Sequence, residues 1–346
     1  EIDLTNNSGI SLNSEVLPGT YVTELNNAHV IGQHSTLFSH NMTCLVDDQD
    51  LAEVERSDLV SVTQARNLLG FASAQGEDAV DKVLAEIPKD IIHIKKCIVL
   101  SSRASDNYFH WLIEVLPKWL LIESCDEYKN FPLLINAHMP KQHYQALKKL
   151  VGNSRQLIGA EQGKHYRIGK LIVPSKLSKI CFDLLSGLEL KKEDVCYHSA
   201  AISFLQSRFS ERMNEKLTRR KIYLTRRSSK LQTRKLLNQN EVEIFYAHKG
   251  YEMIDMATLS FQQQIAIFQS ASAIAGVSGA SFSNLVFAPK DCKVTLIVPE
   301  GGDYQLIYER LANSVGINCF SFVEGSIDKS CKVSGHANFT VNTKAL

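Results

Sequence analysis

The sequence lacks closely spaced cysteines, an appreciable net charge and a long apolar run, and each absence excludes a class of protein. Its 8 cysteines are scattered over 346 residues without a C-x-x-C pair. We therefore expect no zinc site and favour a reducing, cytoplasmic compartment over a disulfide framework. The 38 Lys and Arg residues nearly balance the 37 Asp and Glu residues, which argues against nucleic acid as a partner. Neither the composition nor any motif predicts a cofactor.

No segment of the sequence is suited to cross a membrane as a helix. Residues 256–289 are uncharged, but glutamines, serines and glycines interrupt the stretch and exclude a bilayer span. We expect no signal peptide, although the sequence starts without Met, which leaves room for a removed N-terminal anchor. Three N-x-S/T sequons, at Asn6, Asn41 and Asn338, keep the lumen of the secretory pathway as the alternative location.

Strand-like and helix-like segments alternate after the first 90 residues, and this alternation predicts parallel sheets covered by helices. The length favours about two domains. We expect two Rossmann-like α/β domains over residues 1–199 and 200–325, followed by a loosely held tail over residues 326–346. The expected strands cover residues 91–102, 131–136, 168–174, 221–225, 251–255, 273–277 and 293–298. The expected helices begin near residues 107, 141, 200, 234 and 260, the last with a capping box from Ser260 to Gln263.

Basic residues follow one expected strand, and a loop of small residues follows another. Arg226, Arg227 and Lys230 come directly after the strand at 221–225, while residues 278–284 (S-G-A-S-F-S-N) follow the uncharged strand at 273–277. Guanidinium groups bind phosphate oxygens in pairs, and backbone N–H groups at the start of a helix bind the remaining oxygens. Parallel sheets bind ligands at the carboxyl ends of their strands. The pattern therefore predicts a nucleotide or a nucleotide-activated substrate.

A second group of polar residues lies on one expected helix. Asn107, His110, Glu114 and Lys118 are spaced so that they share one helical face, with Asp106 as the expected N-cap. Pro117 removes the hydrogen bond to the carbonyl of residue 113, so we expect a kink beside Glu114. Two interpretations remain open at this point. The His–Glu pair is either a solvated surface pair or a buried acid–base pair suited to proton transfer.

Asp48 and Asp50 form a D-x-D pattern, with which some sugar transferases hold a divalent metal. The following residues, 51–55, are typical of a solvated helix start, where acids are favoured by the helix dipole. We therefore keep a metal site at Asp48 and Asp50 only as an alternative.

Three groups of residues resemble the motifs of glycosyltransferase family 61. Residues 107–117 (NYFHWLIEVLP) resemble its N-x-x-H motif with an acid four residues later and then a proline. Residues 223–227 and 234–241 resemble its arginine pair and its R-x-x-x-N-E helix. Residues 250–287 resemble its L-S-F-x-E-Q … H-G-A-x-x-x-N-x-x-F segment. The matches cover about residues 100–300 in order. The chain departs from the family pattern at Ser278, where histidine is usual, and at Gln239, where glutamate is usual.

The resemblance implies a GT-B architecture, in which two Rossmann-like domains face a cleft, and a metal-independent transfer that inverts the anomeric carbon. The implied partners are a nucleotide-sugar donor and a glycan or lipid-linked glycan acceptor, and the local pattern favours bacterial capsule or lipopolysaccharide assembly. Such a role fits a location at the inner membrane face with peripheral membrane association. The implied catalytic residues are Glu114 as the base and His110 as its partner. The implied donor-binding residues are Arg226, Arg227, Lys230, Ser278, Gly279, Ala280 and Asn284, with Asn107 and Glu241 as further candidates.

The alternatives are a metal-dependent transferase that uses Asp48 and Asp50, and a non-catalytic module that binds a nucleotide sugar or glycan. The second is prompted by Ser278.

Overall fold

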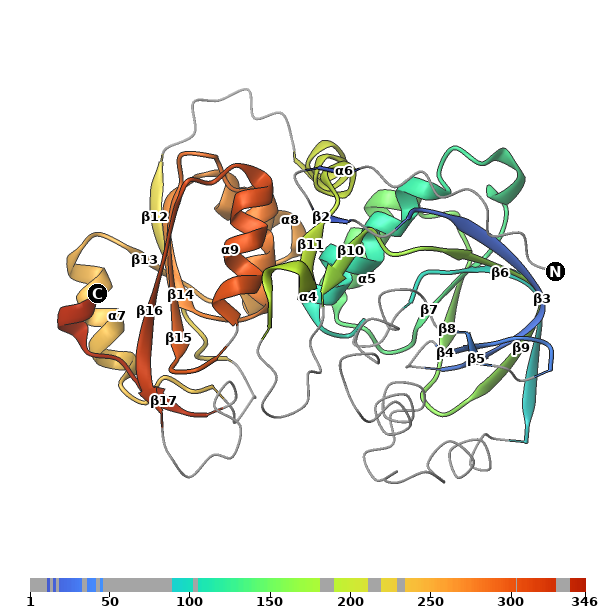
Figure 1. Ribbon diagram of the computed structural model, residues 1–346, viewed down its shortest axis with the longest axis horizontal. Coiled ribbons are helices and arrows are strands. Elements are labelled where there is room, and N and C mark those ends of the chain that lie inside the picture. The colour runs from blue at the N-terminus through green and yellow to red at the C-terminus, as the bar shows by residue number, and fades with distance from the viewer. Residues whose placement is uncertain are drawn as a thin grey trace. The chain divides into compact units, whose positions relative to one another are not determined.

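The computed structural model describes residues 11–12, 15–16, 19–32, 36–41, 44–45, 89–101, 105–180, 190–210, 219–228, 234–302, 304–327 and 337–346. The chain divides into two compact units, Glu1–Leu188 and Glu189–Leu346 (Figure 1). Each unit has its own sheet, so the expected mixed α/β class is confirmed. Helix α6 (Ser199–Phe209), which we expected to begin the second domain, lies inside the second unit.

The first unit contains a seven-stranded mixed sheet in the order β5-β4-β3-β9-β6-β7-β8. Its strands are β3 (Val22–Ile31), β4 (Thr36–Phe38), β5 (Cys44–Leu45), β6 (Ile91–Val99), β7 (Leu133–Asn136), β8 (Leu157–Ala160) and β9 (His165–Pro174). From β9 to β8 the strands are parallel, but β3 pairs with β9 antiparallel. The parallel pairing expected after residue 90 is therefore confirmed for β6 to β9. The antiparallel strands β3 to β5 lie within the polar first 90 residues, for which the sequence predicted no strands.

The remaining described elements of this unit are short strands and helices. They are β1 (Ser11–Leu12), β2 (Glu15–Val16), α4 (Tyr108–His110), η1 (Trp111–Val115), η2 (Leu116–Leu121), η3 (Asp126–Tyr128), α5 (Lys141–Val151) and β10 (Ser178–Ile180). Strand β6 is exposed over its first residues and buried over its last three, which are apolar. Its buried carboxyl end leads to the segment that contains α4 and η1.

The second unit contains a six-stranded sheet in the order β13-β12-β14-β15-β16-β17. Its strands are β12 (Arg220–Leu224), β13 (Glu252–Ile254), β14 (Ala271–Val277), β15 (Lys293–Pro299), β16 (Cys319–Ile327) and β17 (Phe339–Thr340). All pairs are parallel except β16–β17. The other described elements are η4 (Lys192–Asp194), β11 (Val195–Tyr197), α6, α7 (Gln239–His248), η5 (Met256–Thr258), α8 (Phe261–Gln269), η6 (Ala280–Phe287), α9 (Tyr304–Val315) and η8 (Thr343–Ala345).

The central strand of this sheet is β14, and its small uncharged residues fit that place. All its residues except Ser272 are buried, as expected of a strand covered on both faces. A Cβ at Gly276 would lie 2.9 Å from the carbonyl oxygen of Leu224, so only glycine lets β12 and β14 approach at this point. In Figure 1, α7 lies on one side of the sheet and α8 and α9 lie on the other.

The sequence predicted several elements correctly and placed others wrongly. The Ser260–Gln263 capping box is confirmed, with the side chain of each residue accepting the backbone N–H of the other. The helix expected from residue 234 begins at Gln239 instead. The expectation of a loose C-terminal tail is wrong for residues 337–346, because Phe339 and Val341 are buried in the core of the second unit. Their polar neighbours masked this short alternating pattern.

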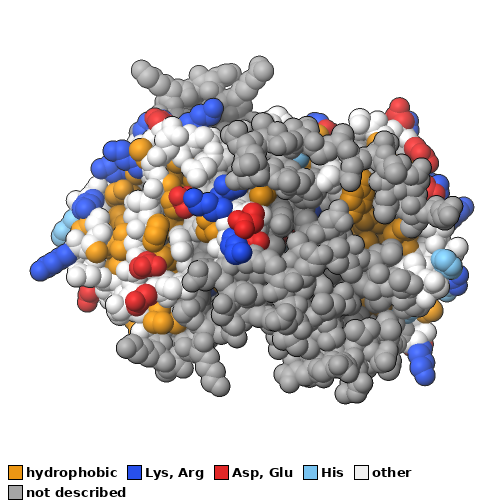
Figure 2. Space-filling view, viewed as in Figure 1, with side chains coloured by type: hydrophobic (Ala, Val, Ile, Leu, Met, Phe, Trp, Pro, Cys, Tyr) orange, Lys and Arg blue, Asp and Glu red, His pale blue; other side chains and the backbone are white. Residues whose placement is uncertain are grey.

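Side chains of both signs are interspersed on the described part of the face shown in Figure 2, in keeping with the near-zero net charge. Among the described residues, no helix is long and apolar enough to span a membrane.

Candidate active site

In the first unit, the segment around Glu114 is not a regular α-helix. The side chain of Asn107, rather than the expected Asp106, caps it by accepting the N–H of Phe109 at 2.9 Å. One turn of α-helix leads into the π-helical turn η1, where the N–H of Leu116 donates to the carbonyl of Trp111, and then into the 3-10 helix η2. Such π-turns are rare and often lie at functional sites.

Pro117 accounts for the irregularity. It has no N–H to donate to the carbonyl of Ile113, and its ring crowds that carbonyl. In the structure this carbonyl accepts a hydrogen bond from the Ser178 hydroxyl at 3.4 Å. Beside Glu114, where the sequence predicted a kink, the segment widens into the π-helical turn η1.

The His110–Glu114 pair is buried. Nδ1 of His110 is hydrogen-bonded to the carboxylate of Glu114, and the exposed fractions of the two side chains are 13% and 7%. The interpretation as a solvated surface pair is therefore wrong. Lys118 is also buried, and its ammonium donates to the carbonyl of Ser101 at 3.3 Å, at the carboxyl end of β6. Three of the four polar residues that share this face, His110, Glu114 and Lys118, are thus largely removed from solvent, whereas Asn107 is exposed.

A histidine that no sequence motif indicated packs against this segment. The ring of His143, on α5, stacks on that of Trp111 with centroids 5.4 Å apart. Burial lowers the pKa of His143 to about 4, against the opposite effects of a backbone hydrogen bond at Ser105 and the charge of Asp106. The imidazole is therefore neutral at neutral pH and packs as an aromatic ring. No spacing in the sequence relates His143 to Trp111, so only the tertiary structure could reveal the contact.

In the second unit, a pocket of about 690 Å³ lies where β12 and β14 end. Ligands bind at this edge in open α/β sheets. The pocket includes two of the predicted site residues with basic side chains, Arg226 and Arg227, together with Glu241. Its full lining is Tyr223, Leu224, Arg226, Arg227, Arg234, Lys235, Leu236, Leu237, Asn238, Gln239, Asn240, Glu241 and Val277.

Arg226 meets the small-residue loop, as the sequence predicted. Its Nη1 donates to the carbonyls of Ser278 and Arg234, each at 3.4 Å. Burial lowers the pKa of Arg226, and the positive charge of Arg234 lowers it further. Because its only hydrogen bonds among the described residues are long bonds to neutral carbonyls, Arg226 can accept a stronger anionic partner.

The loop after β14 has two parts with different hydrogen bonding. The N–H of Ser278 is used in the sheet, where it donates to the carbonyl of Ile297 at 2.8 Å, so it is not available for a ligand. No described residue accepts from the N–H groups of Gly279 or Ala280. Asn284 is buried and donates to Gln264 and to the carbonyl of Ser281, which holds the shape of η6. Of the other candidates, Lys230 and the Asp48–Asp50 pair lie outside the described residues.

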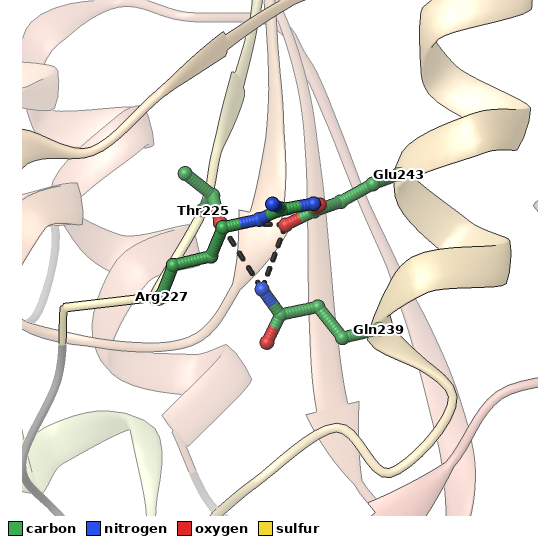
Figure 3. A network of polar contacts seen from close by, with 4 residues as sticks. All are labelled: Thr225, Arg227, Gln239 and Glu243. Atoms are coloured by element: carbon green, nitrogen blue, oxygen red, sulfur yellow. Dashed lines mark hydrogen bonds and ion pairs between the residues drawn. The ribbon is translucent and has the colours of Figure 1, made fainter.

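Arg227 is held by a carboxylate, Glu243, that no sequence motif indicated. Glu243, on α7, accepts from Nε of Arg227 at 2.9 Å and also from Nη2. It further accepts from the hydroxyl of Thr225 at 2.6 Å and the amide of Gln239 at 2.7 Å (Figure 3). Burial raises the pKa of Glu243, but these hydrogen bonds outweigh it and hold the pKa below its usual value. Gln239 stands where the family usually has glutamate. Its neutral amide donates a hydrogen bond to the buried Glu243 carboxylate.

The two units therefore present a buried histidine–carboxylate pair and, separately, an arginine-lined pocket at the ligand-binding edge of a parallel sheet. Open α/β sheets bind ligands at such an edge, and a histidine–carboxylate pair can serve in general acid–base catalysis. The chain belongs to glycosyltransferase family 61, since the model of that family, described as Glycosyltransferase 61, matches residues 108–295, more than half of the chain. No protein in the curated set matches it.

Proposed function

We propose that the protein is an inverting, metal-independent glycosyltransferase that moves a sugar from a nucleotide-sugar donor to a glycan or lipid-linked glycan acceptor. The observation that carries the proposal is the pocket at the ends of β12 and β14, into which Arg226 and Arg227 bring positive charge. Family membership supplies the reaction class, and the pocket supplies a place for the donor's diphosphate. The family's two-domain GT-B arrangement, with the acceptor on the first unit, completes the proposal.

In the proposed reaction, the carboxylate of Glu114 takes the proton of the acceptor hydroxyl. The hydroxyl oxygen then forms a bond to the anomeric carbon from the face opposite the diphosphate. The bond between that carbon and the diphosphate oxygen breaks, and its electron pair leaves with the nucleoside diphosphate. His110 orients the Glu114 carboxylate through the hydrogen bond that joins them. General-base catalysis of this kind typically contributes about 10²- to 10⁴-fold to a rate.

Negative charge develops on the leaving diphosphate, and fixed donors stabilise it best. We assign this role to Arg226 and Arg227 and to the N–H groups of Gly279 and Ala280. Lys230 remains a further candidate. Asn284 keeps the loop in shape through its two hydrogen bonds. The role of the enzyme in capsule or lipopolysaccharide assembly, at the cytoplasmic face of a membrane, is part of the same proposal and rests on the family resemblance.

A binding screen with the full chain tests the proposal. Thermal unfolding is followed with a panel of nucleoside diphosphates and nucleotide sugars, because a ligand that binds the native state raises the melting temperature. We expect at least one nucleoside diphosphate to stabilise the protein and the matching nucleotide sugar to release free diphosphate when acceptor is added. The absence of stabilisation by every nucleotide would contradict the donor site. Stabilisation without release of diphosphate would instead identify a non-catalytic binding module.

A further inference from the structure

Two histidines face each other across neighbouring strands of the first unit. His29 lies on β3 and His165 begins β9, and Nδ1 of His29 is 2.8 Å from Nε2 of His165. Their ring centroids are 5.0 Å apart, and the ring planes are tilted by 45°. Both residues are buried. The two rings therefore form an imidazole–imidazole hydrogen bond between the antiparallel strands β3 and β9.

This hydrogen bond limits how many protons the pair can take up. A neutral imidazole has one nitrogen that donates and one that accepts, whereas a protonated imidazole only donates. One of the two rings must therefore stay neutral, so the pair can take up one proton but not two. Among the described residues, no group of three His, Cys, Asp or Glu side chains could hold a metal ion, so we interpret the pair as a hydrogen bond.

The groups on the strands beside the pair are neutral or positive. Arg167, on β9, lies opposite His29 on β3 and opposite His93 on β6. The other residues opposite the two histidines do not titrate and are Ile31, Phe38 and Ile91. Of the acids near in sequence, Glu161 is exposed in the turn before β9, and Glu24 pairs with Lys170 near the start of β3.

These surroundings favour the neutral form of His29. Burial lowers its pKa from the ordinary value of 6.5. Positive charge on its neighbours lowers the pKa further, from His165, Arg167 and His93 in decreasing order. The contribution of a neutral His29 to stability is therefore complete above pH 6.5, the pKa in the unfolded chain, and is lost as the pH falls from there through the folded-state pKa.

The strand that carries His29 attaches one edge of the sheet. In the order β5-β4-β3-β9, the described strands β4 and β5 join the rest of the sheet through β3. His29 lies in the part of β3 that pairs with both neighbours, opposite Phe38 of β4 and Arg167 of β9. A change at His29 therefore acts on the pairing of three strands.

We propose that the His29–His165 pair is a pH-sensitive clasp, which holds β3 on β9 at neutral pH and releases it as the pH falls. A second proton breaks the hydrogen bond between the rings and places two buried cations close to Arg167. Opening exposes both rings to water, where each can be protonated, so protons favour the open state. The clasp uses neither the nucleotide pocket nor the His110–Glu114 pair, so it does not depend on the proposed function.

Hydrogen–deuterium exchange of the β3 amides in the full chain, followed by mass spectrometry, tests the clasp. At about pH 5.5 a free histidine is protonated about ten times more often than it is neutral. Opening of β3 should therefore be up to about tenfold more frequent than at about pH 7.5 for each proton that the folded pair refuses. His29→Gln cannot be protonated, and its amide oxygen can accept from a protonated His165.

Comparison at a single pH removes the pH dependence of the intrinsic exchange rates, which are the same for both proteins. The ratio of wild-type to His29→Gln exchange in β3 should rise by up to about tenfold between about pH 7.5 and about pH 5.5. The matched control is His138→Asn, which removes an exposed histidine of the first unit. His138 has a φ of 58°, a left-handed conformation that asparagine tolerates. The ratio of wild-type to His138→Asn exchange should stay constant.

Arg167→Gln separates charge from packing, because it leaves both histidines in place. Without the neighbouring positive charge the pair takes up protons more easily, so the pH dependence of β3 exchange should weaken. The proposal is overturned if β3 shows the same pH dependence in the wild type and in His29→Gln, or if Arg167→Gln leaves that dependence unchanged. If His29→Gln fails to fold, the comparison of Arg167→Gln with the wild type decides the question.

Discussion

Glu243 and Arg227 join the first turns of α7 to the chain that leaves β12. The Glu243 carboxylate, with 4% of its side chain exposed, accepts two hydrogen bonds from a guanidinium whose side chain is 64% exposed. The buried acid therefore fixes the direction of an arginine that lines the pocket. Thr225 and Gln239 occupy the other oxygen of Glu243, so the carboxylate is fully hydrogen-bonded.

Replacing Glu243 should lower stability more than replacing an exposed paired acid. Glu243→Gln keeps the shape of the side chain but removes the charge that strengthens its hydrogen bonds. We expect the free energy of unfolding to fall by about 1–2 kcal/mol. The control, Glu252→Gln, breaks a half-exposed pair with Arg220 and should cost less than about 1 kcal/mol. Urea unfolding measures both, and equal losses would show that burial of Glu243 has no energetic consequence.

The stabilisation by Glu243 should depend on pH in a defined direction. Its pKa in the folded protein lies below the ordinary value of 4.5, so the folded state favours the charged form. The contribution is therefore complete above pH 4.5 and disappears as the pH falls through the folded-state pKa. The difference in unfolding free energy between the wild type and Glu243→Gln should shrink below pH 4.5. The other carboxylates titrate in the same way in both proteins, so their effects cancel in this difference. If the difference in unfolding free energy stayed constant down to pH 3, it would contradict the lowered pKa of Glu243.

Glu114 should be essential for turnover but not for donor binding. Glu114→Gln keeps most of the hydrogen bonding but cannot take the acceptor proton, so turnover should fall by about 10²- to 10⁴-fold. Nucleoside diphosphate affinity should remain within about twofold, since the donor pocket lies in the other unit. The control is Glu127→Gln, an exposed acid of the first unit. Near-normal turnover by Glu114→Gln would leave Glu114 as a structural residue.

His110→Ala separates two roles for the histidine. If His110 only orients the Glu114 carboxylate, the loss of turnover should be smaller than that of Glu114→Gln. A larger loss would make His110 itself the base.

Transfer should persist in excess EDTA. The proposed site neutralises the leaving diphosphate with arginines and backbone N–H groups instead of a divalent ion. The rate of diphosphate release is measured with EDTA and after addition of Mn²⁺. Loss of activity in EDTA and its recovery with Mn²⁺ would move the assignment to Asp48 and Asp50.

Local signals in the sequence were sufficient for part of the fold and the site. The uncharged run that became β14, the capping box at Ser260 and the effect of Pro117 each depend on residues that are close in sequence. The approach of Arg226 to Ser278 was also predictable, because adjacent parallel strands end at the same edge of a sheet.

Contacts between distant residues followed no local rule. Glu243 lies within helix α7, where the sequence gives no sign that it is buried, and only the tertiary structure reveals its partner Arg227. The stack of His143 on Trp111 and the docking of Phe339 beside Lys235 also join segments whose spacing carries no periodic signal.

By itself, the sequence determined the α/β class, the family and the positions of the two arginines after β12, because these depend on periodicity and short motifs. The tertiary structure decided how each of these side chains is partnered. Glu243 holds Arg227 and balances its charge, whereas no described carboxylate forms an ion pair with Arg226, although Glu241 also lines the pocket. The physical reason is that the strength of a charge depends on its burial and its partners, and both are set by the packing of residues far apart in the chain.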